Sequence, residues 1–313
     1  MTSNRQGLVR NIPSPVKRAV RKRCGFGCVV CGDAFYEYDH LEVEFKDAVE
    51  HDPERIVLLC GGCHGKKTRG FLSTESIIAA SKNPRCLQVG FTRGGMDVGG
   101  DAPEVVLGTI TATNFSSLIT IDGEDIFSIA PPEEAGGPFR INASLYDQSG
   151  AQILEIVENE IRVGIANWDA ELVGQRITLR SGLGAFSLIL RVEPPRRLVI
   201  ERMHMNHRGL KVECIEGKPT ILERNGWKVE AGGIDLDHVK RVIVMDGPTL
   251  SIGAEGGPLS SVKIKSITVN SGPAWPTNVP MSPTLPVGAW RQPRNELCRC
   301  GSGVKFKRCH GRL

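Results

Sequence analysis

Short runs that alternate between apolar and polar residues fill the chain between residues 100 and 270. The runs are rich in Val, Ile, Leu and Thr, and Gly, Asp, Asn or Pro separates each run from the next. This pattern is typical of many short β-strands, and the segment "YDQSGAQ" (146–152) predicts a hairpin turn between two of them. We found no convincing long helix in this region. Residues 91–272 are therefore expected to form an all-β domain, as a sandwich, a barrel or a solenoid.

The first 90 residues have a mixed pattern. "PSPVKRAVRKRCG" (13–25) predicts a short helix that is capped by its serine and ended by its last glycine. "YEYDHLEVE" (36–44) and "RIVLLC" (55–60) are strand-like, the segment after them resembles the start of a helix, and "STESIIAASKNP" (73–84) predicts another helix. The pattern indicates a small α+β domain over residues 1–90.

The C-terminal end differs from both regions. Residues 273–293 contain six prolines and one charged residue, which is typical of an extended linker. Residues 294–313 follow as a short separate tail. The expected fold class is therefore a multidomain chain: a small α+β domain, an all-β middle domain, a linker and a tail.

Composition narrows the possible functions. The chain has 313 residues, of which 40% are hydrophobic and 24% charged, and no apolar run approaches the length of a membrane span. The basic N-terminus lacks the apolar segment of a secretory signal, so we expect a cytoplasmic protein with no membrane partner. Lys and Arg exceed Asp and Glu by 14 to 10 in residues 1–90 and by 7 to 1 in residues 273–313, whereas residues 91–272 carry 18 against 24. The two ends can therefore face a polyanion, and the acidic middle is not expected to be a broad nucleic-acid surface.

Ten cysteines are present, and eight of them lie in two short segments. Such clustering without a secretory signal favours zinc over disulfides. In the N-terminal segment, Cys28-x2-Cys31 is followed after 28 residues by Cys60-x2-Cys63, a spacing that predicts a tetrahedral four-thiolate zinc site. Cys24 fits this spacing poorly and is interpreted as a small buried residue.

A resemblance to a known family follows from these residues. "CGFGCVVCGDAFYEYDHLEVEF" and "HDPERIVLLCGGCHGKKTRG" combine an Asp-His pair with two C-x-x-C steps, the second continuing as C-H-x-x-K-T. This pattern resembles the zinc-containing branch of the HNH endonucleases, over roughly residues 15–85. The resemblance implies a ββα-metal fold for residues 1–90 and hydrolysis of phosphodiester bonds, in DNA, leaving a 5′ phosphate.

The same resemblance implies roles for individual residues. Asp39 and His64 would bind a catalytic Mg²⁺ or Mn²⁺, and His40 would be the general base, for which an imidazole is suited near neutral pH. Three basic residues after His64 would grip phosphates; these are Lys66, Lys67 and Arg69.

One position departs from the family pattern. Arg55 stands where the family has an asparagine that holds the loop and orients the base. Arg55 can instead contact a phosphate, and His51 or Asp52 can substitute for the asparagine. The alternative function is a zinc adaptor that binds nucleic acid or protein without catalysis. A nuclease joined to a non-catalytic domain also suggests, by analogy, a regulated defence effector.

The tail contains a second zinc pattern. "CRCGSGVKFKRCHG" supplies four ligands, Cys298, Cys300, Cys309 and His310, and metal would provide the folding free energy of so short a segment. The segment resembles the SEC-C motif, known from the tail of the bacterial preprotein translocase motor, where it engages a partner protein. We expect a second structural zinc there and a partner protein or nucleic acid.

Overall fold

A computed structural model describes residues 3–270 of the chain. The helices are α1 (Ser14–Cys24), the 3-10 helix η1 (Pro53–Arg55), α2 (Gly61–Thr68), α3 (Thr74–Lys82) and α4 (Arg85–Val89). The first strands are β1 (Glu37–His40), β2 (Ile56–Leu59), β3 (Phe91–Gly95), β4 (Glu104–Leu107), β5 (Ile110–Thr113), β6 (Ser117–Ile121), β7 (Glu124–Ala130), β8 (Arg140–Tyr146), β9 (Gln152–Val157) and β10 (Glu160–Gly164). The later strands are β11 (Asp169–Val173), β12 (Arg176–Gly182), β13 (Ala185–Glu193), β14 (Arg197–His207), β15 (Leu210–Ile215), β16 (Thr220–Arg224), β17 (Trp227–Asp246) and β18 (Thr249–Asn270).

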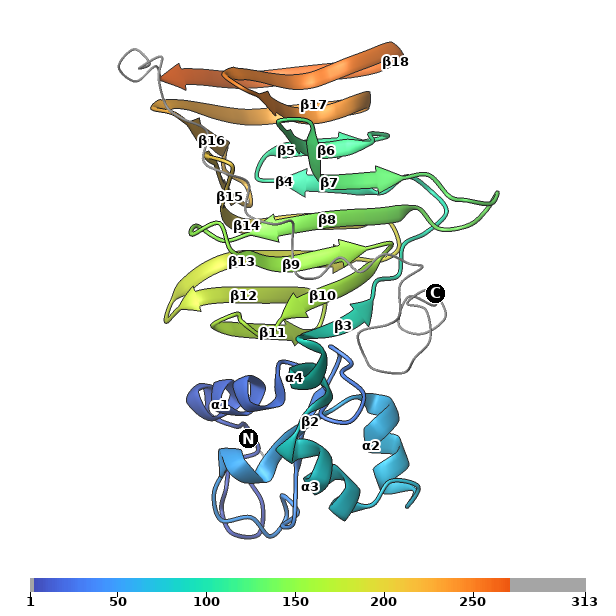
Figure 1. The fold of residues 1–313 in the computed structure, drawn as a ribbon, viewed down its shortest axis with the longest axis vertical. Helices are drawn as coiled ribbons and strands as arrows, with labels where there is room; N and C mark the ends of the chain where they lie inside the picture. The colour runs from blue at the N-terminus through green and yellow to red at the C-terminus, as the bar shows by residue number, and fades with distance from the viewer. Residues whose placement is uncertain (1–2, 271–313) are drawn as a thin grey trace.

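One mixed sheet of sixteen strands dominates the molecule (Figure 1). Its first wing runs from β6 through β7, β8, β9 and β10 to β3, and its second wing runs from β16 back through β15, β14, β13 and β12 to β11. β17 joins the wings, because it pairs with β16 on one side and with β6 on the other. Most neighbouring strands are antiparallel, but β4 lies parallel to β14, and β5 and β6 lie parallel to β17.

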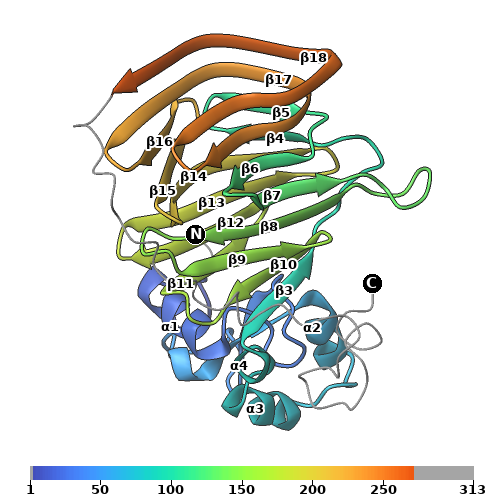
Figure 2. The same ribbon diagram turned by 45° about the horizontal axis from the view of Figure 1, so that its top comes forward.

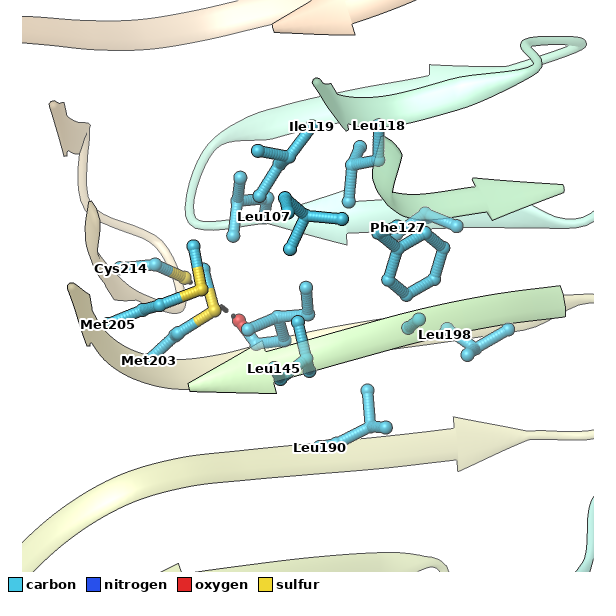
Figure 3. Packing of buried hydrophobic residues seen from close by; sticks show 14 of the residues in the cluster. Leu107, Leu118, Ile119, Phe127, Leu145, Leu190, Leu198, Met203, Met205 and Cys214 are labelled. Carbon is cyan, nitrogen blue, oxygen red and sulfur yellow. Dashed lines mark hydrogen bonds between the residues drawn. The ribbon is translucent and has the colours of Figure 1, made fainter. Parts of the chain in front are cut away.

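The core lies between the two wings. Figure 3 shows Leu107 of β4, Phe127 of β7 and Leu145 of β8 converging with Leu190 of β13 and Met203 of β14. These side chains are at most 1% exposed and belong to one continuous apolar cluster. Burial of this apolar surface is the main force that holds the wings together.

The predicted fold class is wrong. The described chain is mostly β, and the middle region is one large mixed sheet rather than one of the three architectures expected. No ββα-metal domain stands at the N-terminus as an α+β unit. β1 and β2 form only a two-stranded sheet, while Phe26 and Ala34 of the same segment belong to the core of the large sheet. Asp33 also bridges to Arg93 of β3, which extends the backbone pairing into this segment.

Several local predictions agree with the structure. β8 and β9 form the predicted hairpin, and the Asp147 carboxylate accepts hydrogen bonds from the backbone N–H groups of Ser149 and Ala151 in its turn. Ser73 caps α3 as expected. The predicted cap of α1 is wrong, because Pro13 occupies the cap position and Ser14 is already helical, whereas Gly25 ends the helix in the left-handed conformation. No helix within residues 3–270 is long and apolar enough to cross a membrane.

A buried ionic network attaches the N-terminal segment to the sheet. Arg21 of α1 donates two hydrogen bonds to Asp169 of β11, at 2.8 and 2.6 Å, and further bonds to Glu171 and to the hydroxyl of Tyr38. Arg180 of β12 donates to both acids. Burial by itself lowers the pKa of Arg21, but the hydrogen bond to Asp169 and the charges of Tyr38, Asp169 and Glu171 together hold the pKa above its usual value. The helical end shown below the sheet in Figures 1 and 2 is therefore tied to β11, whose two acids also bind Arg180 of β12.

Candidate metal centre and active site

The four N-terminal cysteines come together from two elements. Cys28 and Cys31 lie in the loop after α1, where the Gly32 N–H donates to the Cys28 carbonyl and closes a tight turn. Cys60 is the N-cap of α2, and Cys63 lies in the first turn of that helix. All four sulfur atoms lie within 4.8 Å of one another. Sulfurs bound to one zinc at about 2.3 Å are about 3.8 Å apart, so the cluster could hold a tetrahedral zinc ion.

The pKa values of these thiols differ because the four sulfur atoms lie so close together. The hydrogen bond from the Cys31 thiol lowers the pKa of Cys28 to about 5. That bond raises the pKa of Cys31, and burial raises the pKa of Cys63 to about 12. Sulfurs packed this closely cannot all ionise without a positive charge among them, and a coordinated dication supplies that charge.

Cys24 and His64 stand apart from this cluster. Cys24 is fully buried, as expected, and burial raises the pKa of its thiol to about 11. The metal-competent group within residues 3–270 contains the four cysteines and not His64. The His64 ring instead has Nε2 at 3.6 Å from Oδ1 of Asp39 on β1.

Asp39 is the centre of a polar cluster beside the cysteines. Its side chain is 13% exposed, and its carboxylate faces both His64 and Lys67 of α2, with Lys67 Nζ paired with Oδ2. β1 brings Asp39 here through its antiparallel pairing with β2, which places Asp39 opposite Val57. Two ligands that each lie about 2.1 Å from one cation are at most about 4.2 Å apart, and the 3.6 Å separation of Asp39 Oδ1 from His64 Nε2 is within that limit.

His40 contacts a second histidine. His40 Nε2 lies 3.3 Å from Nδ1 of His51, and His51 Nε2 lies 2.8 Å from the backbone carbonyl of Val9. Burial lowers the pKa of His40, the nearby His51 lowers it further, and the Asp39 charge opposes this only in part. The His40 imidazole is therefore neutral near neutral pH, the form that a general base requires.

The basic residues have different surroundings. Lys66 and Arg69 are exposed, whereas Lys67 is engaged by Asp39. Arg55 is exposed, and its side chain pairs with that of Asp52 at 3.5 Å. The Arg55 carbonyl accepts from the Leu41 N–H and so holds the backbone next to His40.

Sequence reasoning missed two partners of this site. Val9 contacts His51 only through its backbone carbonyl, which any residue could supply. Arg21 of α1 donates a hydrogen bond to the hydroxyl of Tyr38, which precedes Asp39 on β1. The sequence indicated only that this helix is basic. Neither contact leaves a spacing signal, because both depend on how the chain folds back.

Comparisons with known proteins bear on the tail. Residues 294–312 match the family described as SEC-C motif, which confirms the motif expected from the sequence. A curated relative, "Protein translocase subunit SecA" of Gluconobacter oxydans (strain 621H), is 47% identical over 53 residues, which cover 12% of this chain and 6% of that protein. No solved structure matches the chain. The predicted tail ligands lie outside the described residues; they are Cys298, Cys300, Cys309 and His310.

Proposed function

We propose that the chain is a metal-dependent endonuclease of the HNH type that hydrolyses phosphodiester bonds in DNA. The observation that carries the proposal is the 3.6 Å approach of His64 Nε2 to Asp39 Oδ1, with the neutral His40 next to Asp39 in the chain. Asp39 and His64 would supply a cation site, and His40, the next residue along β1, would supply a base.

Asp39 and His64 would hold Mg²⁺ or Mn²⁺, which when bound would neutralise charge on the phosphate and on the leaving oxygen. His40 takes one proton from the attacking water. The new bond to phosphorus forms, the bond to the 3′ oxygen breaks, and that oxygen takes a proton from solvent. The product ends are a 5′ phosphate and a 3′ hydroxyl.

Charge supports a nucleic-acid substrate. Lys66 and Arg69 are exposed beside His64, and Lys22 is the exposed basic residue in the last turn of α1. Exposed basic residues attract phosphates without reading the base sequence. The acidic sheet is left for regulation or for a protein partner, as in a cytoplasmic defence effector.

Replacing His40 with alanine tests the chemistry. His40→Ala should lower turnover in a plasmid-nicking assay with Mg²⁺ or Mn²⁺ by at least about 10²-fold, because the general base is lost. Zinc content should not change, since His40 is not part of the cysteine cluster. His204→Ala is the matched control, because His204 lies on β14 of the large sheet and should retain wild-type turnover. Wild-type nicking by His40→Ala would refute the mechanism.

One observation favours the alternative, a zinc adaptor without catalysis. The Lys67 ammonium occupies Asp39 Oδ2, where it can replace a cation. An adaptor would bind DNA with or without EDTA and would nick none of it. A nuclease would lose nicking in EDTA and regain it with Mg²⁺.

The tail is proposed to bind a partner rather than to take part in catalysis. Deleting residues 294–313 should remove one zinc and leave cleavage of short DNA at low salt nearly intact. Affinity for a partner or for long nucleic acid should fall, with a weaker salt dependence if phosphates are the target. Cys309→Ser, which keeps the length and charge of the tail, should lose the same zinc. Zinc quantification and nicking assays check both parts, and loss of cleavage of short DNA would contradict this assignment.

A further inference from the structure

The N-terminal arm, residues 3–12, covers the loop that carries His51. Asn4 Nδ2 donates to the carbonyl oxygens of Phe45 and Ala48, and Arg10 lies over the Phe45 ring at 5.6 Å. A bridge between Ser3 and Val9 closes the arm. The arm therefore fixes both the loop and the Val9 carbonyl that faces His51.

The Val9 carbonyl determines which nitrogen of His51 carries hydrogen. A carbonyl oxygen only accepts hydrogen bonds, so His51 Nε2, at 2.8 Å, must be the donor. In a neutral imidazole the other nitrogen, Nδ1, is then an acceptor. His40 Nε2, 3.3 Å from that atom, must donate to it. A neutral His40 with hydrogen on Nε2 has its lone pair on Nδ1.

We propose that His51 is a positioning residue that fixes His40 in the Nε2–H tautomer and so makes His40 Nδ1 the atom that receives the proton. The inference rests on the proposed nuclease function for its catalytic meaning. The relay runs from the Val9 carbonyl through His51 to His40. Aromatic packing keeps the rings in place: Phe45 stacks on His51 with 8° between the ring planes, and it also contacts His40. His51 therefore contacts and orients His40, the role that the family's asparagine would have at the position of Arg55.

Two substitutions of His51 separate its two hydrogen bonds. In His51→Asn, the side-chain oxygen occupies the place of Nδ1, so it can still accept from His40 but no longer reaches Val9. In His51→Gln, the amide nitrogen reaches the place of Nε2, so it can still donate to Val9 but offers His40 no acceptor. The variants are similar in polarity, so they control for each other in folding and zinc content.

The tautomer can be measured without any cleavage. Long-range ¹H–¹⁵N correlation spectra of the full, zinc-loaded chain labelled in its histidines, at pH 8 without Mg²⁺, report which ring nitrogen carries hydrogen; the His40→Ala spectrum assigns the His40 signals. We expect a single Nε2–H form for His40 in the wild type and in His51→Asn. In His51→Gln we expect the tautomer mixture of an unrestrained imidazole, with a detectable Nδ1–H fraction beside the Nε2–H form. An Nδ1–H wild type, or a His51→Gln spectrum like that of the wild type, overturns the proposal.

Kinetics provide the second measurement. His51→Asn should exceed His51→Gln in kcat by about tenfold, with similar KM, because the change affects the base rather than DNA binding. Equal kcat values in an active enzyme would also overturn the proposal. If the wild type cuts no DNA while the tautomers follow the expected pattern, the proposed function fails and the hydrogen-bond assignment stands.

Discussion

Cys60→Ser should remove the N-terminal zinc and unfold residues around it. Cys60 supplies one of four sulfurs and also caps α2, where its sulfur accepts the Cys63 N–H. Structural zinc contributes about 10–16 kcal/mol of apparent binding free energy in small zinc-dependent peptides, which is comparable to the whole stability of a typical domain, about 5–15 kcal/mol. Zinc content should therefore fall by one equivalent, and limited proteolysis should cut within residues 3–90.

Two neighbouring substitutions act as controls. Cys24→Ala removes a buried thiol that lies outside the cluster, and should lose no zinc. His64→Ala should also keep the zinc and the fold while it abolishes nicking, because His64 faces Asp39. Zinc retained in Cys60→Ser but lost in His64→Ala would show that the histidine, and not this cysteine, is the ligand.

Arg21→Ala should destabilise the whole chain by about 3–5 kcal/mol, the usual cost of leaving one partner of a buried ion pair uncompensated. Arg21 and Asp169 are 4% and 3% exposed, so water cannot replace the lost hydrogen bonds. Arg180 remains beside Asp169 and keeps the loss from being larger. Chemical denaturation measures the change in unfolding free energy.

The matched control is Arg197→Ala. Arg197 pairs with Glu104 and Glu193, but its side chain is 45% exposed. Exposed pairs typically contribute no more than about 1 kcal/mol. If both substitutions cost the same free energy, the Arg21 network is not what attaches the N-terminal segment to the sheet.

The sequence predicts those features whose causes are local. The turn between β8 and β9 depends on an aspartate and a glycine within seven residues, and Ser73 caps a helix from the position before it. The four cysteines are spaced for one metal, and the structure brings them within ligand distance of one another. The order Asp39, His40 and His64 is equally visible in the chain.

The sheet could not be predicted in this way. Its parallel pairs bring together strands that are far apart in the sequence, so no turn motif marks them. β5 beside β17 is an example. β17 and β18 are interrupted by glycines and polar residues, so each was expected as separate short strands. The contact of His51 with His40 was one of two alternatives from the sequence, and only the folded loop distinguishes His51 from Asp52.

The late closure of the sheet has a consequence for synthesis on the ribosome. Thr109 contacts Gly233, 124 residues later, and Arg21 contacts Asp169, 148 residues later. The first wing therefore emerges well before β17, the strand that joins it to the second wing, and such high contact order slows folding. The cysteine cluster is complete by residue 63, so zinc can bind while most of the sheet is still untranslated. The yield of native protein should therefore depend on two supplies during translation. One is zinc for the cysteine cluster, and the other is chaperones that shield the unpaired strands.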